Sequence, residues 1–126
     1  MPLVRVDVPE STTAAHKDAI ADGIYAALHS VFGAPNGDKF IIINSHDPAN
    51  LYIDPHYFVD RSERAIIIQI TLNAGRSVEL KKEFYRTVAD GLQAAIGIRT
   101  EDVFINLVEV PKENWSFGGG IAQYAD

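Results

Sequence analysis

The feature that most restricts the fold of this chain is an internal repeat. When the sequence is shifted by about 64 residues, its two halves agree in the order of their apolar segments and in the glycines that follow them. The matched positions are Ile20 with Phe84, Leu28 with Leu92, Gly33 with Gly97, Asp38 with Asp102, Phe40 with Phe104, and Ile41 with Ile105. One structural unit that occurs twice therefore has to account for most of the chain.

Each half has the pattern of a strand, a helix and a second strand. Residues 2–8 alternate apolar and polar side chains, which is typical of a half-buried strand. From Ala14 the apolar residues follow a helical spacing, and a Gly-Pro-Asn-rich segment at 33–37 ends that helix before a strand at 38–44. The pattern returns as a strand at 65–72, a helix with apolar positions from Leu80 to Ile96, and a strand at 102–110.

Two strands joined by a crossing helix run parallel in one sheet. The repeat at about 2–46 and 65–110 therefore predicts an α+β fold: two tandem βαβ units form a four-stranded mixed sheet with both helices on one face. We expect a single domain over 1–126, with an irregular excursion at 45–63 and a tail at 111–126. The other sheet face is uncovered and its strands are too apolar for water, so we expect further copies of the chain to cover it.

The composition excludes several classes of function. A net charge of −6 argues against nucleic-acid and anionic-membrane partners, and no apolar run approaches the roughly 20 residues of a membrane span. The absence of cysteine excludes disulfides, thiolate nucleophiles and thiolate metal ligands. The histidines lack the paired spacing of metal ligands, and the start lacks a signal-peptide pattern. We therefore expect a cytoplasmic protein without a metal site.

The first residues offer a reactive group that needs no side chain. If Met1 is removed, which a small following residue permits, Pro2 carries a free secondary amine at the start of an apolar strand. Such an amine can act as a base, an acid or a nucleophile. A proline at this position can also be without function, so the case depends on the groups that the fold brings near it.

The expected topology brings two charged residues to Pro2. The parallel strands of the first unit begin at the same sheet edge, which places Asp38 beside Pro2. A pseudo-twofold axis between the units makes the central strands antiparallel, so the third strand ends at this edge and Arg76 follows it. The same argument sends Asp102 to the opposite edge, where it makes no such site.

These groups suggest a pocket for an acid. Asp38 beside the amine favours its charged form, so Pro2 could polarise or protonate a substrate, and Asp38 could alternatively activate a water. Arg76 can bind a carboxylate through two parallel hydrogen bonds, while Trp115 and Phe117 can exclude water. Simpler roles exist: a turn residue for Asp38, a surface charge for Arg76, and core or interface residues for the aromatics.

The chain resembles the tautomerase superfamily of N-terminal-proline enzymes, and within it the malonate semialdehyde decarboxylases. The resemblance extends nearly from end to end and rests on residues 2–7, 38–40, 45–48, 74–77, 102–104 and 115–124. The Trp-Ser-Phe-Gly sequence at 115–118, combined with Asp38 and Arg76, is its most specific part. One position departs from part of that group, since Ala74 stands where some members carry a second arginine.

The resemblance implies a cofactor-independent lyase and usually a homotrimer. Pro2 would be the catalytic residue and cationic, Arg76 would bind the carboxylate that leaves as carbon dioxide, and Asp38 would assist Pro2 or a water. Trp115 and Phe117 would line the site. The proline would polarise the aldehyde oxygen of a 3-oxo acid or form an iminium with it, and either provides the electron sink that decarboxylation requires.

Two other functions stay open. A keto–enol tautomerase acting on a 2-oxo acid such as phenylpyruvate needs a neutral Pro2 as base, so the protonation state of Pro2 separates it from the decarboxylase. A non-catalytic trimeric binding module would keep the fold without the chemistry. The presence of Pro2, Asp38 and Arg76 together argues against that module.

Overall fold

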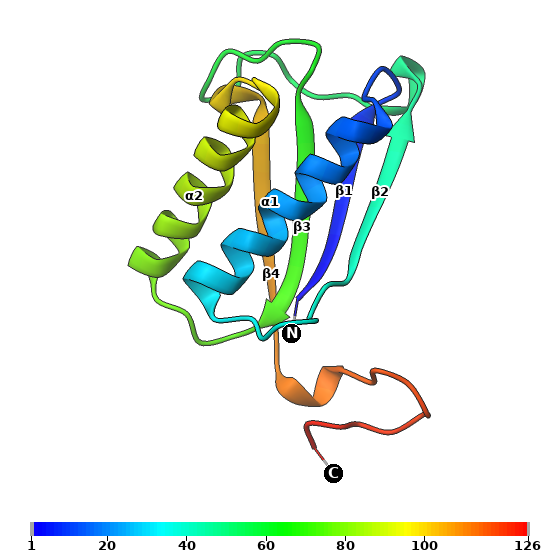
Figure 1. The fold of residues 1–126 in the computed structure, drawn as a ribbon, viewed down its shortest axis with the longest axis vertical. Coiled ribbons are helices and arrows are strands. Elements are labelled where there is room, and N and C mark those ends of the chain that lie inside the picture. Colours follow the sequence, from blue (N-terminus) through cyan, green and yellow to red (C-terminus); the bar gives the residue numbers. More distant parts are fainter. Residues whose placement is uncertain (1, 126) are drawn as a thin grey trace.

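The computed structural model describes residues 2–125 and contains the elements that the repeat predicts (Figure 1). The strands are β1 (Leu3–Pro9), β2 (Ile41–His46), β3 (Ile66–Asn73) and β4 (Val103–Val110), and the helices are α1 (Ala14–Phe32) and α2 (Val78–Ile96). Three short 3₁₀ turns accompany them: η1 (Pro48–Asn50), η2 (Thr100–Asp102) and η3 (Lys112–Asn114). The second and fourth strands begin slightly later than expected, because turns precede both.

The sheet has the order β2-β1-β3-β4. The outer strands run parallel to their inner neighbours, β2 to β1 and β4 to β3, and the two inner strands are antiparallel. Arg5 of β1 pairs with Gln69 of β3, which is its own counterpart in the repeat. The pseudo-twofold axis therefore passes through this pair, and the mixed α+β sheet that the repeat predicts is confirmed.

The two helices are equivalent residue by residue at their ends. Thr13 and Ser77 cap them, each accepting a hydrogen bond from a backbone N–H three residues later. Gly33 and Gly97 end them with a φ of 71°, a left-handed conformation that glycine adopts without steric cost. The two helices therefore end at the same position of the repeat. The loops that follow them, which lead into β2 and β4, lie at opposite ends of the sheet.

Both helices cover the same face of the sheet (Figure 1). The hydrophobic core lies between this layer of helices and the sheet. Every second residue of β1 and β3 points into it, and all of these are at most 2% exposed: Val4, Val6, Val8, Ile66, Ile68, Ile70 and Leu72. The helices contribute repeat-related pairs, Ile20 with Phe84 and Leu28 with Leu92. Full burial of such a side chain contributes about 1.5–3 kcal/mol, so the core stabilises both units jointly.

The other face of the sheet is open. Large apolar side chains on it remain accessible, with exposed fractions of 50% for Phe40, 40% for Ile42, 41% for Phe104 and 38% for Val108. They share this face with polar and charged residues, among them Arg5 and Gln69 at its centre. The uncovered face that we expected is therefore present, although it is more mixed in character than the strand patterns alone indicate.

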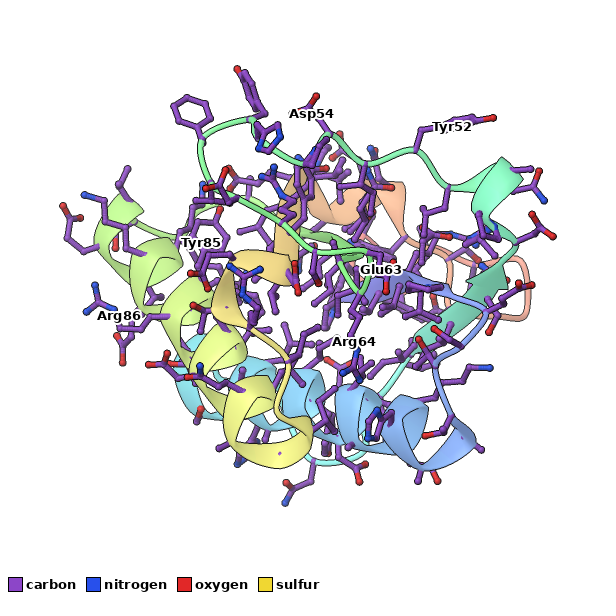
Figure 2. The ribbon with its side chains drawn as sticks, turned by 90° about the horizontal axis from the view of Figure 1, so that it is seen from above. Tyr52, Asp54, Glu63, Arg64, Tyr85 and Arg86 are labelled. Atoms are coloured by element: carbon purple, nitrogen blue, oxygen red, sulfur yellow. The ribbon has the colours of Figure 1, made fainter. Side chains whose placement is uncertain are left out.

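Two irregular segments lie at opposite ends of the sheet (Figure 1). The 45–63 excursion runs past the start of β3, and Figure 2 shows its Tyr52 and Asp54 on the side of the sheet away from α1. The tail follows β4 and extends beyond the end of the sheet at which the N-terminus lies. Within residues 2–125, no helix has both the length and the apolar character needed to cross a membrane.

Candidate active site

The candidate site lies at the sheet edge where β1 starts, β2 is entered and β3 ends (Figure 1). Pro2 is buried and directly precedes Leu3, which pairs with Thr71 near the end of β3. On the other side of β1, the Val4 N–H donates to the Phe40 carbonyl over 2.9 Å, which brings the entry of β2 alongside the chain start. The topology therefore brings two segments close to Pro2 that lie about 38 and 70 residues after it in the sequence.

Asp38 occupies a tight turn before β2 and is only 5% exposed. Its N–H donates to the Pro35 carbonyl over 3.1 Å, and the preceding Gly37 has a φ of 86° and donates its N–H to the Tyr25 hydroxyl over 2.8 Å. Burial raises the pKa of Asp38 because it disfavours the charged carboxylate, and the positive charge at the amino terminus of the chain acts in the opposite direction. Asp38 is thus more than a turn residue on the surface.

Arg76 is held in place from two sides. Its Nη1 donates to the Asn73 carbonyl over 2.8 Å, and its guanidinium carbon lies 4.9 Å from the centre of the Phe32 ring. Phe32 itself stacks on the buried Phe84, with ring centres 4.3 Å apart. The arginine is therefore a partly buried, oriented group, unlike a mobile surface charge, and an oriented guanidinium suits a planar carboxylate.

Asn73, which the sequence reasoning missed, connects the arginine to the tail. Its backbone carbonyl accepts from Arg76, and its side-chain Oδ1 accepts from the Trp115 indole Nε1 over 2.8 Å. A polar residue that ends the apolar β3 strand was the signal available in the sequence. Its two acceptors place Trp115 beside the same loop as Arg76.

The tail forms a small aromatic cluster of its own. Trp115 and Phe117 stack with ring centres 5.5 Å apart, and Phe117 meets Tyr124 edge-on at 5.3 Å. Gln123 closes this loop, since its side chain accepts from the Phe117 N–H and donates to the Gly118 carbonyl. Trp115 therefore contacts the edge directly, whereas Phe117, which is 38% exposed, reaches it through Trp115.

Asp102 lies at the opposite edge, as the twofold argument predicts. It is 1% exposed and accepts from the Ser62 N–H over 2.7 Å and from the Ser62 hydroxyl over 2.6 Å. Its carboxylate anchors the end of the excursion to the start of β4. The excursion, which contains Tyr52 and Tyr57, lies at that end as well and away from the start of the chain (Figure 1).

The described residues contain no cluster of three or more His, Cys, Asp or Glu side chains that could hold a metal ion. Three of the histidine side chains have protein partners instead: His29 the Ala34 carbonyl, His46 the Asp7 carboxylate, and His56 the Asp60 carboxylate. The charged side chains that the fold brings to the Pro2 edge are the Asp38 carboxyl and the Arg76 guanidinium.

Comparison with known proteins shows which family the chain resembles. Residues 38–118 and 2–61 match two family models, each described as "Tautomerase enzyme". The probable tautomerase YusQ of Bacillus subtilis (strain 168) is 32% identical over 124 residues, which cover 98% of each chain. The structure of FG41 malonate semialdehyde decarboxylase inhibited by 3-bromopropiolate is 36% identical with a TM-score of 0.89, over 97% of this chain and 93% of that chain.

A more distant structure shares the fold. The fused 4-OT described as a wild-type symmetric trimer is 24% identical, with a TM-score of 0.80 over 98% of this chain and 97% of that one. At this level of identity the likeness concerns the architecture of two βαβ units and carries no statement about the reaction.

Proposed function

Since this chain belongs to the tautomerase family, we propose that it is an N-terminal-proline enzyme that decarboxylates malonate semialdehyde or a similar 3-oxo acid. The observation that carries the proposal is the meeting of Pro2, buried Asp38 and oriented Arg76 at one sheet edge. The 36% identity to a malonate semialdehyde decarboxylase supports this choice of reaction. Removal of Met1 is part of the proposal, because only then is Pro2 an amine.

Arg76 is the group that would bind the carboxylate of the substrate. A guanidinium has five N–H donors, and among the described residues Arg76 uses Nη1 for the Asn73 carbonyl. The remaining donors can form two parallel bonds to a carboxylate. Since Ala74 supplies no second cation, Arg76 would determine the orientation of the carboxylate relative to Pro2.

Pro2 would supply the electron sink. As an ammonium it can donate a hydrogen bond to the aldehyde oxygen, or as an amine it can condense with the aldehyde to an iminium with loss of water. In either route the carbon–carbon bond to the carboxylate breaks, carbon dioxide leaves, and the electron pair moves toward oxygen or nitrogen. A proton then returns to carbon, which gives acetaldehyde directly in the first route. In the second route it gives the iminium of acetaldehyde, and a water hydrolyses this to acetaldehyde and free Pro2. Asp38 would favour the cationic proline or position a water.

Trp115 and Phe117 would shield this chemistry from water. Trp115 is held at the edge by Asn73, and Phe117 stacks on it. Exclusion of water strengthens the interactions of the guanidinium and the amine with the substrate. The tail would therefore act as one wall of the substrate pocket.

A second reaction remains a candidate because the curated relative is described as a probable tautomerase. Keto–enol tautomerisation of a 2-oxo acid such as phenylpyruvate would use neutral Pro2 as the base and Arg76 for the carboxylate. The two reactions use the same residues, so only the protonation state of Pro2 and the products distinguish them.

We also propose that the chain assembles as a homotrimer. The open sheet face exposes apolar side chains, including Phe40, Ile42, Phe104 and Val108. Burial of this face between copies would remove them from water and extend a small core. The related fused 4-OT structure is described as a trimer, and a mass measurement in solution would test the same state here.

The deciding experiment follows both candidate reactions by proton NMR. Protein with Met1 removal verified by mass is given malonate semialdehyde in one sample and phenylenolpyruvate in another, with Pro2→Ala as the parallel control. We expect acetaldehyde from the first sample and only with Pro2 present. Rapid ketonisation without decarboxylation would replace the proposal by the tautomerase, and no turnover in either sample would refute both.

Arg76→Ala tests carboxylate binding, and Arg86→Ala is its matched control. Arg86 extends from α2 away from the rest of the molecule (Figure 2). We expect Arg76→Ala to lower kcat/KM by about tenfold to a hundredfold, as loss of a charged hydrogen-bond pair does, and Arg86→Ala to leave it unchanged. Equal effects of the two variants would show that Arg76 acts only through overall charge.

A further inference from the structure

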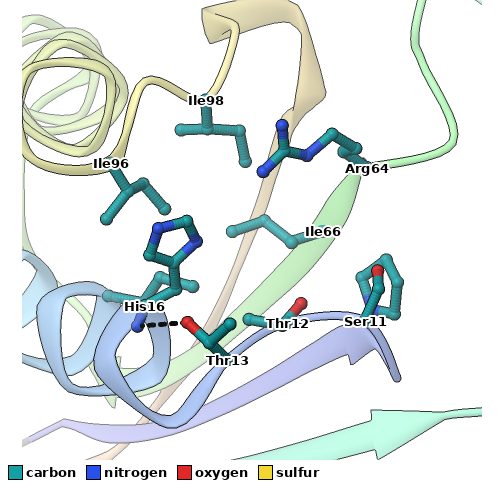
Figure 3. Close-up of a pocket in the computed structure, with 10 residues that line it drawn as sticks. Ser11, Thr12, Thr13, His16, Arg64, Ile66, Ile96 and Ile98 are labelled. Carbon is teal, nitrogen blue, oxygen red and sulfur yellow. Dashed lines mark hydrogen bonds between the residues drawn. The ribbon is translucent and has the colours of Figure 1, made fainter.

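A cavity lies at the end of the sheet opposite Pro2, at positions that the repeat relates to the candidate active site. It has a volume of about 100 Å³ and lies between the start of α1, the start of β3 and the end of α2 (Figure 3). At an offset of 64 residues, its Ile66 corresponds to Pro2 and its Thr12 to Arg76. The cavity therefore lies where the second unit repeats the backbone positions of Pro2 and Arg76.

The charges of this cavity differ from those of the candidate site. In the first unit the chain starts at Pro2, whereas in the second unit it continues backwards from Ile66 to Arg64, which lines the cavity. The carboxylate that corresponds to Asp38 is Asp102, and its oxygens accept from Ser62. None of the ten residues that line the cavity is acidic, so a cation is present there without a carboxylate.

Arg64 and His16 both point into the cavity from opposite sides. Figure 3 shows the guanidinium of Arg64 above Ile66 and directed toward the His16 ring, which stands on the first turn of α1. Among residues 2–125, neither side chain makes a hydrogen bond or an ion pair; the backbone N–H of His16 donates to Thr13 and that of Arg64 donates to the Ser62 hydroxyl. Two nitrogen-bearing groups that face one cavity and lack protein acceptors can take a shared anion.

The remaining walls define the kind of anion. Hydroxyls of Ser11 and Thr12 lie on one side, and the isoleucines at 66, 96 and 98 form an apolar surface opposite them (Figure 3). Polar donors next to an apolar wall suit a molecule with a charged head and a short hydrocarbon tail. Glu10 and Glu63 line the adjoining cavity of about 560 Å³, so the approach is acidic and disfavours multiply charged anions.

We propose that this cavity binds a short-chain aliphatic monocarboxylate, with the carboxylate between Arg64 and His16 and the alkyl chain on the isoleucine surface. Arg64 donates to the carboxylate oxygens, and the Thr12 hydroxyl adds a hydrogen bond. The site performs no chemistry on the ligand, because Ile66 stands where the first unit has Pro2. It makes the protein a binder of small acids at a position remote from Pro2 and Arg76.

Butyrate is the probe for this site, and the ring signals of His16 in two-dimensional NMR are the reporter. Titration at constant ionic strength is done with butyrate, with neutral butyramide and with inorganic phosphate. We expect saturable shifts of the His16 signals with butyrate alone. The titration is repeated in Arg76→Ala protein, so that binding at the candidate active site does not contribute and the result does not depend on the proposed reaction.

Arg64→Ala and Arg86→Ala form the matched pair of variants. Arg64 is exposed, so its removal leaves the core intact, and we expect it to weaken butyrate binding about fivefold while Arg64→Lys retains part of the affinity. Arg86→Ala should leave binding unchanged. Equal shifts with butyramide or phosphate, equal affinity in Arg64→Ala protein, or no saturable shift of His16 would each overturn the proposal.

Discussion

Asp38 and Asp102 occupy the same position in the two repeats, and both are buried, but their surroundings differ. Asp102 accepts two hydrogen bonds from Ser62, so its carboxylate is part of the structure of its edge. Asp38 lies at the edge where the chain begins, and burial raises its pKa. The same repeat position thus holds a hydrogen-bonded carboxylate in the second unit, while in the first it places a buried acidic group near the start of β1.

The difference arises from what precedes each unit. The second unit follows the 45–63 excursion, which delivers Ser62 to Asp102 and Arg64 to the cavity. A repeated fold therefore produces two similar edges, and the segment that leads into each unit decides which further groups its edge carries.

The largest expected effect is on activity, and it should distinguish a substitution at Pro2 from one at its repeat counterpart, Ile66. We expect Pro2→Ala to lower kcat by about 10²–10⁴-fold with little change in stability, because the secondary amine is the proposed catalytic group. Ile66→Ala should instead cost about 2–5 kcal/mol of unfolding free energy, since Ile66 is 2% exposed in the core. Steady-state kinetics and urea unfolding of both variants at one protein concentration test this. A fully active Pro2→Ala would remove the chemical distinction between the edges.

Asp102→Ala should be the next largest effect, and it should act on stability. Loss of the carboxylate leaves the Ser62 N–H and hydroxyl without their acceptor in a part-buried place, at a cost of about 3 kcal/mol. A double-mutant cycle with Ser62→Ala should recover part of this loss, because the hydroxyl is then absent. A stability equal to that of the parent protein would show that the contact carries no energy.

Asn73→Ala should have a smaller effect, confined to the Pro2 edge. The backbone carbonyl that holds Arg76 remains, whereas the acceptor for the Trp115 indole is lost. We expect kcat/KM to fall about fivefold, equivalent to one neutral hydrogen bond of about 1 kcal/mol, and Trp115 fluorescence to shift toward that of a more solvated indole. Unchanged fluorescence would mean that other contacts hold the tail.

The smallest expected effect is a pH-dependent stability from Asp38. Because its pKa is raised in the folded protein, the folded state binds more protons than the unfolded state from the ordinary value of 3.8 up to the raised one. Its contribution to stability therefore falls as the pH rises through that window. Asp38→Asn should melt slightly higher than the parent at neutral pH and the same at low pH. A lower melting temperature at neutral pH would contradict the raised pKa.

Much of the fold could be predicted because it follows from local patterns. The alternation in β1, the apolar spacing in both helices, and Gly33 and Gly97 at the helix ends are short-range signals that the sequence carries directly. Right-handed parallel connections and the repeat then leave few arrangements of four strands. The placement of Pro2, Asp38 and Arg76 at one edge follows from that topology, while their chemical roles stay predictions.

The groups that could not be predicted depend on contacts between distant segments. Asn73, which also holds Arg76, bonds Trp115 at a distance of 42 residues in the sequence, and Ser62 bonds Asp102 at a distance of 40. Gln123 closes the tail on Phe117 and Gly118 through a loop that has no periodic pattern. Hydrogen bonds of single side chains leave no repeated signal in a sequence, so their partners appear only in three dimensions.

The sequence by itself determined the two-unit architecture, the capped helices and the edge at which the chain begins, because these result from periodic burial and from the conformations open to glycine and proline. Tertiary structure decided what each edge can do. It buried Asp38 near the start of the chain and placed Arg76 against the Phe32 ring. It also brought Asp102 into hydrogen-bond contact with Ser62 and directed the side chains of Arg64 and His16 toward one cavity (Figure 3). Those outcomes depend on where side chains meet after folding, and that information is not contained in either repeat alone.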